Sequence, residues 1–388
     1  MASKITRNNI MIADILSRLP VKTLLRFKSV CKSWRCMIGD SSLGFQALHY
    51  DRSQRKPRFL LQWPDFDFRP LEPAGCQYVY NFISIDTEGN MISPIQVKVQ
   101  EPVKLILPGC HGLLCLATET RIHVFNPSTR HLVALPADGG ETAGFGIGYL
   151  SPAKGHVVVR LNIPRQSRTS LSWKLECSVF TFLPENGGPR WRAVEDGCPY
   201  LVEQFSFPAF ANETIYWKID RGKHQALHRH NDFIVSFNIS DEKFQTITHP
   251  ADWRPETHRQ RRSPVRNSTQ LVELRGHLYL VETAAFSYVA VWKLSDPGNS
   301  MWSKACTIDI SKFHPSFVGE IQCVKGTEII FNSCTSLLLY YDEKNKTYRR
   351  KMLPCSAANL TIYCESLTFP ATQQEEVTLS HSSQDIQS

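Results

Sequence analysis

The stretch IVSFNISDEKFQTITHP, residues 234–250, joins two short apolar segments through a polar turn, a pattern typical of a β-hairpin. Four further segments share it: residues 122–136, 178–194, 289–308 and 337–354. In each, an apolar strand rich in aromatics is followed by a polar turn and a second strand. Aromatic residues mark equivalent positions about every 50 residues: Phe125, Phe182, Phe237, Trp292 and Tyr341. The sequence therefore predicts a repeated β-unit.

A second strand-like segment precedes four of these hairpins, at residues 110–117, 213–219, 274–282 and 325–333. Each unit thus has about four strands, and a four-stranded unit of this period is typical of a kelch-like β-propeller blade. Residues 59–100 are interpreted as a less regular first blade, so we predict about six blades. A β-sandwich would explain the strands but not their period.

Upstream of the repeats, residues 10–38 change to helical spacing. Pro20 suits the first turn of a new helix, which divides this region into three short predicted helices. Seventeen of its 29 residues are apolar, more than so small a unit can bury around a core of its own. We expect another surface, the following domain or a partner protein, to cover part of them.

The net charge of +8 lies entirely at the N-terminal end of the chain. Residues 1–60 hold twelve Lys or Arg against three Asp or Glu, and the rest is nearly balanced. A basic module suggests an acidic partner, either nucleic acid or an acidic protein. A DNA-reading helix needs exposed polar side chains, whereas the third helix is mostly apolar, which favours a protein interface.

The segment ILSRLPVKTLLRFKSVCKSWRCMI, residues 15–38, strongly resembles the F-box of plant F-box proteins. The resemblance rests on the Leu-Pro pair at residues 19–20, the run at residues 21–27 and the Val-Cys-Lys-x-Trp run at residues 30–34. It implies binding to an acidic Skp-type adaptor and, through it, to a cullin–RING ubiquitin ligase. The implied adaptor-binding residues are Ile15, Leu16, Leu19, Pro20, Leu24, Leu25, Phe27, Val30, Cys31 and Trp34.

The repeats resemble the F-box-associated domain of the same plant proteins. Six segments carry this resemblance: residues 110–116, 125–130, 144–149, 216–217, 291–292 and 365–367. The expected fold is therefore a small all-α F-box of three helices followed by an all-β, propeller-like domain of about six blades. The expected boundaries are an F-box at 1–50, a kelch-like substrate-recognition domain at 51–370 and a disordered tail at 371–388.

Sequence motifs for covalent or metal chemistry do not appear in the chain. Its twelve cysteines include no Cys-x-x-Cys pair, so we expect no metal site and no cofactor. Two basic loops interrupt the repeats, at residues 220–232 and 250–268. Because binding usually lies in such loops, we predict a substrate contact there. Its residues would be His224, His228, Arg259, Arg261 and Arg262.

The expected function is that of a non-catalytic substrate-recognition subunit of a Skp–cullin–F-box ubiquitin ligase, located in the cytoplasm, the nucleus or both. Its partners would be the Skp-type adaptor and an unknown protein substrate. Two alternatives stay open at this point. One is an enzyme with an active site in a propeller channel, which needs metal ligands or paired carboxylates that converge in space. The other is a nucleic-acid-binding protein, whose binding would depend steeply on salt.

Overall fold

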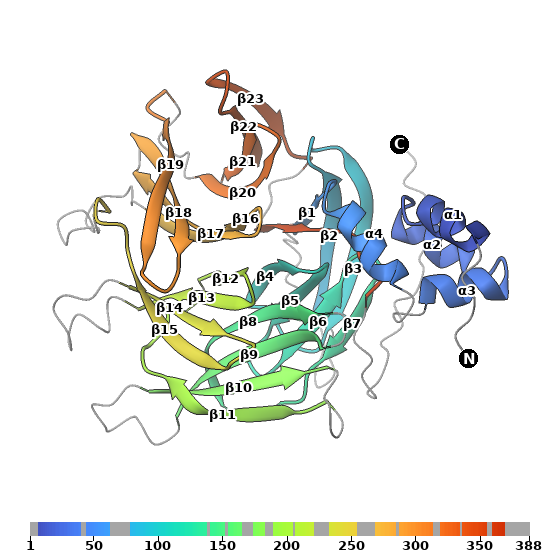
Figure 1. Ribbon diagram of the computed structural model, residues 1–388, viewed down its shortest axis with the longest axis horizontal. Helices are drawn as coiled ribbons and strands as arrows, with labels where there is room; N and C mark the ends of the chain where they lie inside the picture. The colour runs from blue at the N-terminus through green and yellow to red at the C-terminus, as the bar shows by residue number, and fades with distance from the viewer. Residues whose placement is uncertain are drawn as a thin grey trace. The chain divides into compact units, whose positions relative to one another are not determined.

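The structure is a computed structural model. It describes residues 7–39, 44–62, 78–137, 140–151, 154–164, 174–182, 189–204, 206–220, 233–253, 268–284, 287–312, 319–333, 336–354 and 359–368. Four helices come first (Figure 1): α1 (Arg7–Leu16), α2 (Val21–Phe27), α3 (Lys32–Gly39) and α4 (Phe45–Ser53). The three predicted helices are confirmed. The fourth was not predicted, and it extends across residue 50.

The rest of the described chain forms six four-stranded sheets. The strands of the first two sheets are β1 (Arg58–Gln62), β2 (Tyr78–Asp86), β3 (Met91–Val99), β4 (Leu105–Cys110), β5 (Leu113–Ala117), β6 (Ile122–Asn126), β7 (His131–Ala134) and, from the far end of the chain, β24 (Asn359–Tyr363). The next two sheets contain β8 (Glu141–Ser151), β9 (Gly155–Ile163), β10 (Leu175–Thr181), β11 (Trp191–Cys198), β12 (Ala209–Ala211), β13 (Thr214–Lys218), β14 (Phe233–Asn238) and β15 (Lys243–Thr248). The last two contain β16 (Ser268–Leu274), β17 (His277–Ala284), β18 (Tyr288–Asp296), β19 (Met301–Asp309), β20 (Gly319–Lys325), β21 (Glu328–Ser333), β22 (Leu337–Asp342) and β23 (Thr347–Met352).

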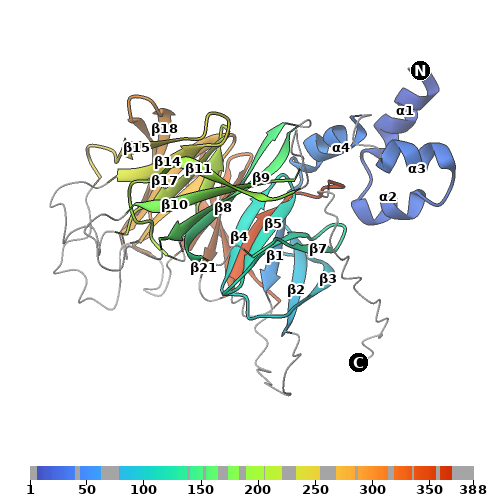
Figure 2. The ribbon, with the colours of Figure 1, turned by 90° about the horizontal axis from the view of Figure 1, so that it is seen from below.

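Five of the sheets are built from four consecutive strands, and the sixth has the order β24-β1-β2-β3. Figure 2 shows β24, in orange-red, among the blue and teal strands from the start of the chain. The predicted first blade is therefore completed by a strand from the C-terminal end. Six four-stranded sheets make a six-bladed β-propeller, which confirms the predicted architecture.

The polar turn of the repeated hairpin has a common structure in four blades. The side-chain oxygens of Asn126, Asn238, Asp296 and Asp342 each accept the backbone N–H two residues later, at 2.8–2.9 Å. Asn and Asp favour such turns because the side chain imitates a backbone turn. This explains why a hydrophobic strand followed by Asn or Asp recurs along the sequence.

The structure corrects two of the five aromatic positions that the sequence predicted to be equivalent. In each case the residue that takes the equivalent place in the blade lies two residues away. Strand pairing sets Phe237 opposite Phe244 and Tyr341 opposite Tyr348. In the third blade, however, Phe180 and not Phe182 lies opposite the outer-strand aromatic residue. In the fifth, Leu294 takes the place expected of Trp292, next to a β-bulge that the spacing could not reveal.

The chain divides into two compact units, Met1–Leu135 with Tyr363–Ser388, and Pro136–Ile362. Within the second unit, outer-strand aromatics bond to the end of the preceding outer strand. Trp302 Nε1 donates to the Thr248 carbonyl and the Tyr348 hydroxyl donates to the Asp309 carbonyl, both at 2.7 Å. Among the described residues, no helix is both long and apolar enough to cross a membrane.

Candidate functional site

The four helices share one small apolar core. Five buried residues from α1 to α4 form it, with Leu367 from the C-terminal end added: Leu16, Val21, Leu24, Ile38, Phe45 and Leu367. The Arg52 side chain of α4 also binds the Asp14 carboxylate and the Ser17 hydroxyl at the end of α1. Apolar packing and an ion pair therefore hold α4 against α1, although α4 was absent from the sequence prediction.

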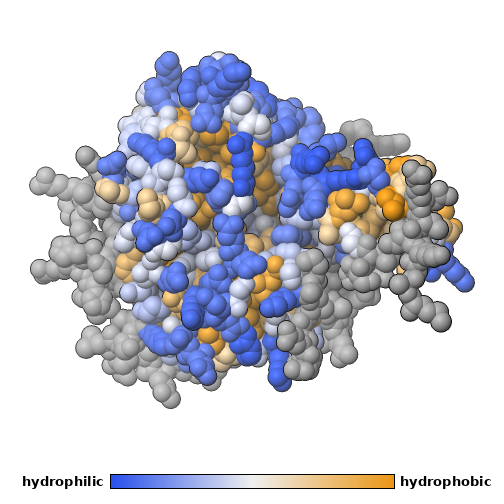
Figure 3. All heavy atoms as spheres, in the orientation of Figure 1, coloured by the Kyte–Doolittle hydropathy of each residue, from blue (hydrophilic) through white to orange (hydrophobic). Residues whose placement is uncertain are grey.

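A second group of apolar side chains in this module faces outward. Met11, Ile15 and Val30 are 61%, 56% and 60% exposed, and Ile10 is similarly exposed. Figure 3 shows apolar side chains gathered on the surface of the helical module. Large apolar side chains that cluster on a surface mark an interaction site. This module thus exposes more apolar surface than its own core can use, as the composition predicted.

Basic side chains surround these apolar residues in the sequence. Five basic side chains are exposed: Arg18, Lys22, Arg26, Lys32 and Arg35. Among the described residues only Arg18 of these forms an ion pair, with Asp14 at 2.8 Å. The four others leave positive charge at the surface. An apolar patch with basic neighbours fits an acidic protein partner, since charge steers association while apolar contact supplies affinity.

The predicted adaptor-binding residues separate into three groups. Ile15, Pro20, Val30 and Cys31 are exposed. Four residues are half-buried and can contact a partner through part of their surface: Leu19, Leu25, Phe27 and Trp34. Leu16 and Leu24 are buried and pack inside the module.

Aromatic packing ties the half-buried group together, because the rings of Phe27 and Trp34 have their centroids 5.3 Å apart. Sequence reasoning missed Ile10 and Met11. Their signal was present, since α1 carries apolar residues on two faces and only one of them can face the core.

Comparison with known proteins identifies both parts of the chain. A model of the F-box domain matches residues 10–46, and a model of the F-box-associated β-propeller domain matches residues 76–369. The chain belongs to the F-box-associated β-propeller family. The module formed by α1–α3 is its F-box. The β-propeller is thereby confirmed, while its kelch-like character stays a prediction.

Relatives from Arabidopsis thaliana match along most of their length. The F-box protein CPR1 is 26% identical, over 79% of this chain and 74% of its own. The F-box protein At1g30790 is 25% identical, with 88% of each chain covered. The F-box protein At2g21930 is also 25% identical, over 87% of this chain and 84% of its own. A solved structure of apo AztD from Citrobacter koseri is 10% identical over 79% of this chain and 98% of its own, with a TM-score of 0.42, too low to inform function.

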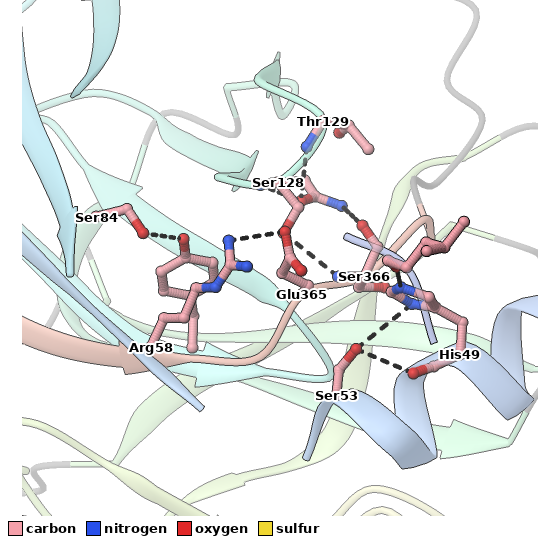
Figure 4. Close-up of polar contacts among 11 residues, drawn as sticks. His49, Ser53, Arg58, Ser84, Ser128, Thr129, Glu365 and Ser366 are labelled. Carbon is pink, nitrogen blue, oxygen red and sulfur yellow. Dashed lines mark hydrogen bonds and ion pairs between the residues drawn. The ribbon is translucent and has the colours of Figure 1, made fainter. Parts of the chain in front are cut away.

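The helical module α1–α4 contacts the first two blades partly through α4. The Tyr50 ring of α4 stacks on the ring of His111, in the β4–β5 turn, with centroids 4.5 Å apart. One residue earlier in α4, His49 is buried and its Nε2 lies 3.1 Å from the Leu19 carbonyl oxygen (Figure 4). Burial lowers the pKa of His49, and it lowers the pKa of His111 to about 4. Both rings are therefore neutral at physiological pH.

We expect this contact to weaken in acid. The unfolded chain protonates a histidine near pH 6.5, whereas folded His111 takes up its proton only near pH 4. Between these values the unfolded state binds more protons, so folding stability falls as the pH is lowered from about 6.5 to about 4. The loss from His111 reaches about 3 kcal/mol at the acid end.

Urea unfolding at pH 7 and pH 4.5 measures this loss. The matched variant is His111→Asn, because Asn also tolerates the left-handed backbone of residue 111, which has φ 46°, and does not titrate. Its stability should depend less on pH than that of the wild type. An equal pH dependence in both proteins would show that His111 does not couple to folding.

The five predicted substrate-contact residues all lie outside the described residues, but the strands that flank their loops are described. The loop at 220–232 connects β13 to β14, and the loop at 250–268 connects β15 to β16. Lys218 pairs with Ile234, and Phe233 pairs with Thr248, so the end of β13, the start of β14 and the end of β15 lie at the same end of the blade β12–β15. At this end of the blade Lys218 Nζ bonds to Glu203 at 2.8 Å and to the Thr269 carbonyl at 2.9 Å.

Proposed function

We propose that this chain is the substrate-recognition subunit of a Skp–cullin–F-box ubiquitin ligase. The observation that carries the proposal is the exposed apolar group Met11, Ile15 and Val30 with basic neighbours, within the segment that matches the F-box domain. Its partner would be an acidic Skp-type adaptor, joined to a cullin–RING ligase. The protein would act in the cytoplasm, the nucleus or both.

In this role the chain performs no covalent chemistry. Holding a target beside a ubiquitin-conjugating enzyme makes the transfer effectively intramolecular, which is the contribution of proximity. The described residues include no group of three or more His, Cys, Asp or Glu arranged to hold a metal. The proposal does not depend on that observation, because the reactive groups belong to other subunits.

The substrate-binding part of the proposal concerns the propeller. The strand ends that flank the loops at residues 220–232 and 250–268 lie at the same end of one blade, which supports a single ligand site for both loops. Their basic residues suit an acidic or phosphorylated segment of a target protein. We propose His224, His228, Arg259, Arg261 and Arg262 as contacts with it.

Co-elution tests the adaptor assignment. The purified full chain, mixed with a recombinant Skp-type adaptor, should elute from a sizing column as a stoichiometric complex. Binding should weaken only moderately as salt is raised, because apolar contact supplies most of the affinity. If no complex forms at concentrations of tens of micromolar, or if the chain binds duplex DNA instead with a steep salt dependence, the assignment is wrong.

A further inference from the structure

The segment Cys364–Thr368, which follows the last strand, lies between the F-box and the turns of the first two blades. Figure 4 shows Glu365 and Ser366 among side chains from α4, β1 and the β6–β7 turn. Leu367 is buried and belongs to the F-box core, although more than 300 residues separate it from the rest of that core. The segment therefore contributes an apolar side chain to the adaptor-binding module itself.

Glu365 connects the start of α2 to the first blade. Its carboxylate lies near the backbone N–H of Val21, the first residue of α2, and this N–H lowers the pKa of the carboxyl group. The N-cap residue of α2 is Pro20, whose side chain makes no capping bond, and a carboxylate near the start of a helix is favourable. The same carboxylate pairs with Arg58 of β1 at 2.8 Å, and both side chains are mostly buried.

Asn126 holds the segment from the second blade. Its side-chain amide donates to the carbonyls of Ser366 and Thr368, at 3.0 and 2.8 Å. The equivalent turn residues of two other blades, Asp296 and Asp342, build the same turn without an amide. The turn itself does not need the Nδ2 group of Asn126, which is fully buried and serves the C-terminal segment.

Gly112 leaves space for the segment. A Cβ atom on Gly112 would lie 2.3 Å from Ser366 Cβ and 2.8 Å from the Cys364 carbonyl oxygen. Gly276 occupies the same type of turn between β16 and β17, with φ +80° against +81° at Gly112. A Cβ on Gly276 would meet no atom within 4 Å. Replacing either glycine by alanine strains the backbone in the same way. Only at position 112 does the new Cβ atom also clash with the C-terminal segment, so the difference between the two variants reports that clash.

We infer that residues 364–368 form a clamp that holds the F-box on the first two blades. The clamp bonds or packs against α2, the F-box core, β1 and the turns β4–β5 and β6–β7. Its consequence for ubiquitin transfer rests on the proposed function. The N-terminal helices bind the adaptor, and residues 364–368 hold these helices on the first two blades, so both segments set the orientation of the adaptor relative to these blades. Glu365, Asn126 and Leu367 are its positioning residues.

Hydrogen exchange in the full-length chain tests the clamp through two matched pairs. Gly112→Ala is compared with Gly276→Ala, and Asn126→Asp with Asn238→Asp. Asp keeps the oxygen that builds the turn but loses the amide donor, and at position 126 it also sets a carboxylate against the Ser366 and Thr368 carbonyls. In Gly112→Ala and Asn126→Asp, amides of α2 should exchange about tenfold faster than in the wild type, because the F-box opens more often. Amides of β5 and β6 should be unchanged, which a general loss of folding would not allow.

The two control variants should leave α2 within about twofold of the wild type. Equal exchange of α2 in Asn126→Asp and Asn238→Asp would overturn the clamp, and that comparison decides the matter even if Gly112→Ala fails to fold. Adaptor binding is measured on the same proteins. If the wild type does not bind the adaptor, the proposed function fails, whereas the exchange result still decides whether the clamp exists.

Discussion

Replacing Met11 and Ile15 together by Asp is expected to abolish adaptor binding while the chain stays folded. The two residues lie four positions apart on α1, so their side chains share one face of the helix. Both are more than half exposed, and their loss costs the F-box core little. In the complex, however, two carboxylates would be buried against apolar surface without partners. We expect affinity to fall at least 100-fold, which is about 3 kcal/mol.

Met352→Asp is the matched control, because Met352 is 66% exposed but lies on the outer strand β23. It makes the same chemical change at a similar exposure and should leave affinity within about twofold of the wild type. Calorimetric titration with the adaptor gives the affinities, and thermal unfolding shows that both proteins remain folded. Undiminished binding by the Met11/Ile15 variant would place the adaptor on another surface.

A variant of the family-matched pair Leu19 and Pro20 is less informative. Leu19 is half-buried and packs against the F-box core, so Leu19→Asp would damage the module as well as its surface. Loss of binding could then follow from unfolding alone.

Glu365→Ala is expected to destabilise the first unit by about 2–4 kcal/mol, because it leaves the Arg58 guanidinium without its ion-pair partner. The side chain of Arg58 is only 20% exposed, so water replaces little of the lost interaction. The variant also removes a negative charge near the Val21 N–H at the start of α2. Both effects act in the same direction.

Glu365→Gln should cost much less. Burial raises the pKa of Glu365 even though Arg58 and the Val21 N–H oppose this shift. The folded chain therefore holds the carboxyl proton more tightly than the unfolded chain. The contribution of this group to stability is full below the unfolded pKa of about 4.5 and is lost as the pH rises through the higher folded value. Gln also removes the charge that pairs with Arg58, but it avoids burying a carboxylate and keeps an oxygen that can accept from the guanidinium.

Urea unfolding of the full chain measures both variants, with Glu328→Ala as a control. Glu328 also pairs with an arginine, Arg349 at 2.7 Å, but that arginine is 42% exposed. Breaking such a solvated pair costs at most about 1 kcal/mol. Similar losses in Glu365→Ala and Glu328→Ala would mean that the Arg58–Glu365 pair contributes no more than a surface ion pair.

Much of the fold could be predicted from the sequence because its signals are local. The hairpins carry apolar segments joined by polar turns at a period near 50 residues, so a number of about six blades could be predicted from the amino-acid sequence. The F-box helices were likewise marked by helical spacing and by Pro20. Exposure on α1 was partly predictable, because apolar residues on two faces of a short helix cannot all be buried.

Features that depend on distant contacts could not be predicted. Strand β24 has five residues, and its partner β1 lies about 300 residues earlier, so no local pattern links them. The displacement of Trp292 by two residues lies beside register shifts of β18 and β19, and such irregularities change which residues face each other without changing the composition. Leu367 and Glu365 act in the F-box only because β24 brings the end of the chain beside it.

The most direct test of adaptor binding is the hydrogen-exchange footprint of a Skp-type adaptor on the full-length chain. We expect slower exchange in α1 and in the turn around Val30 when the adaptor is bound, with no change in the outer strands β19 and β23. Protection confined to the propeller strands, or no protection at saturating adaptor, would contradict adaptor binding through the F-box.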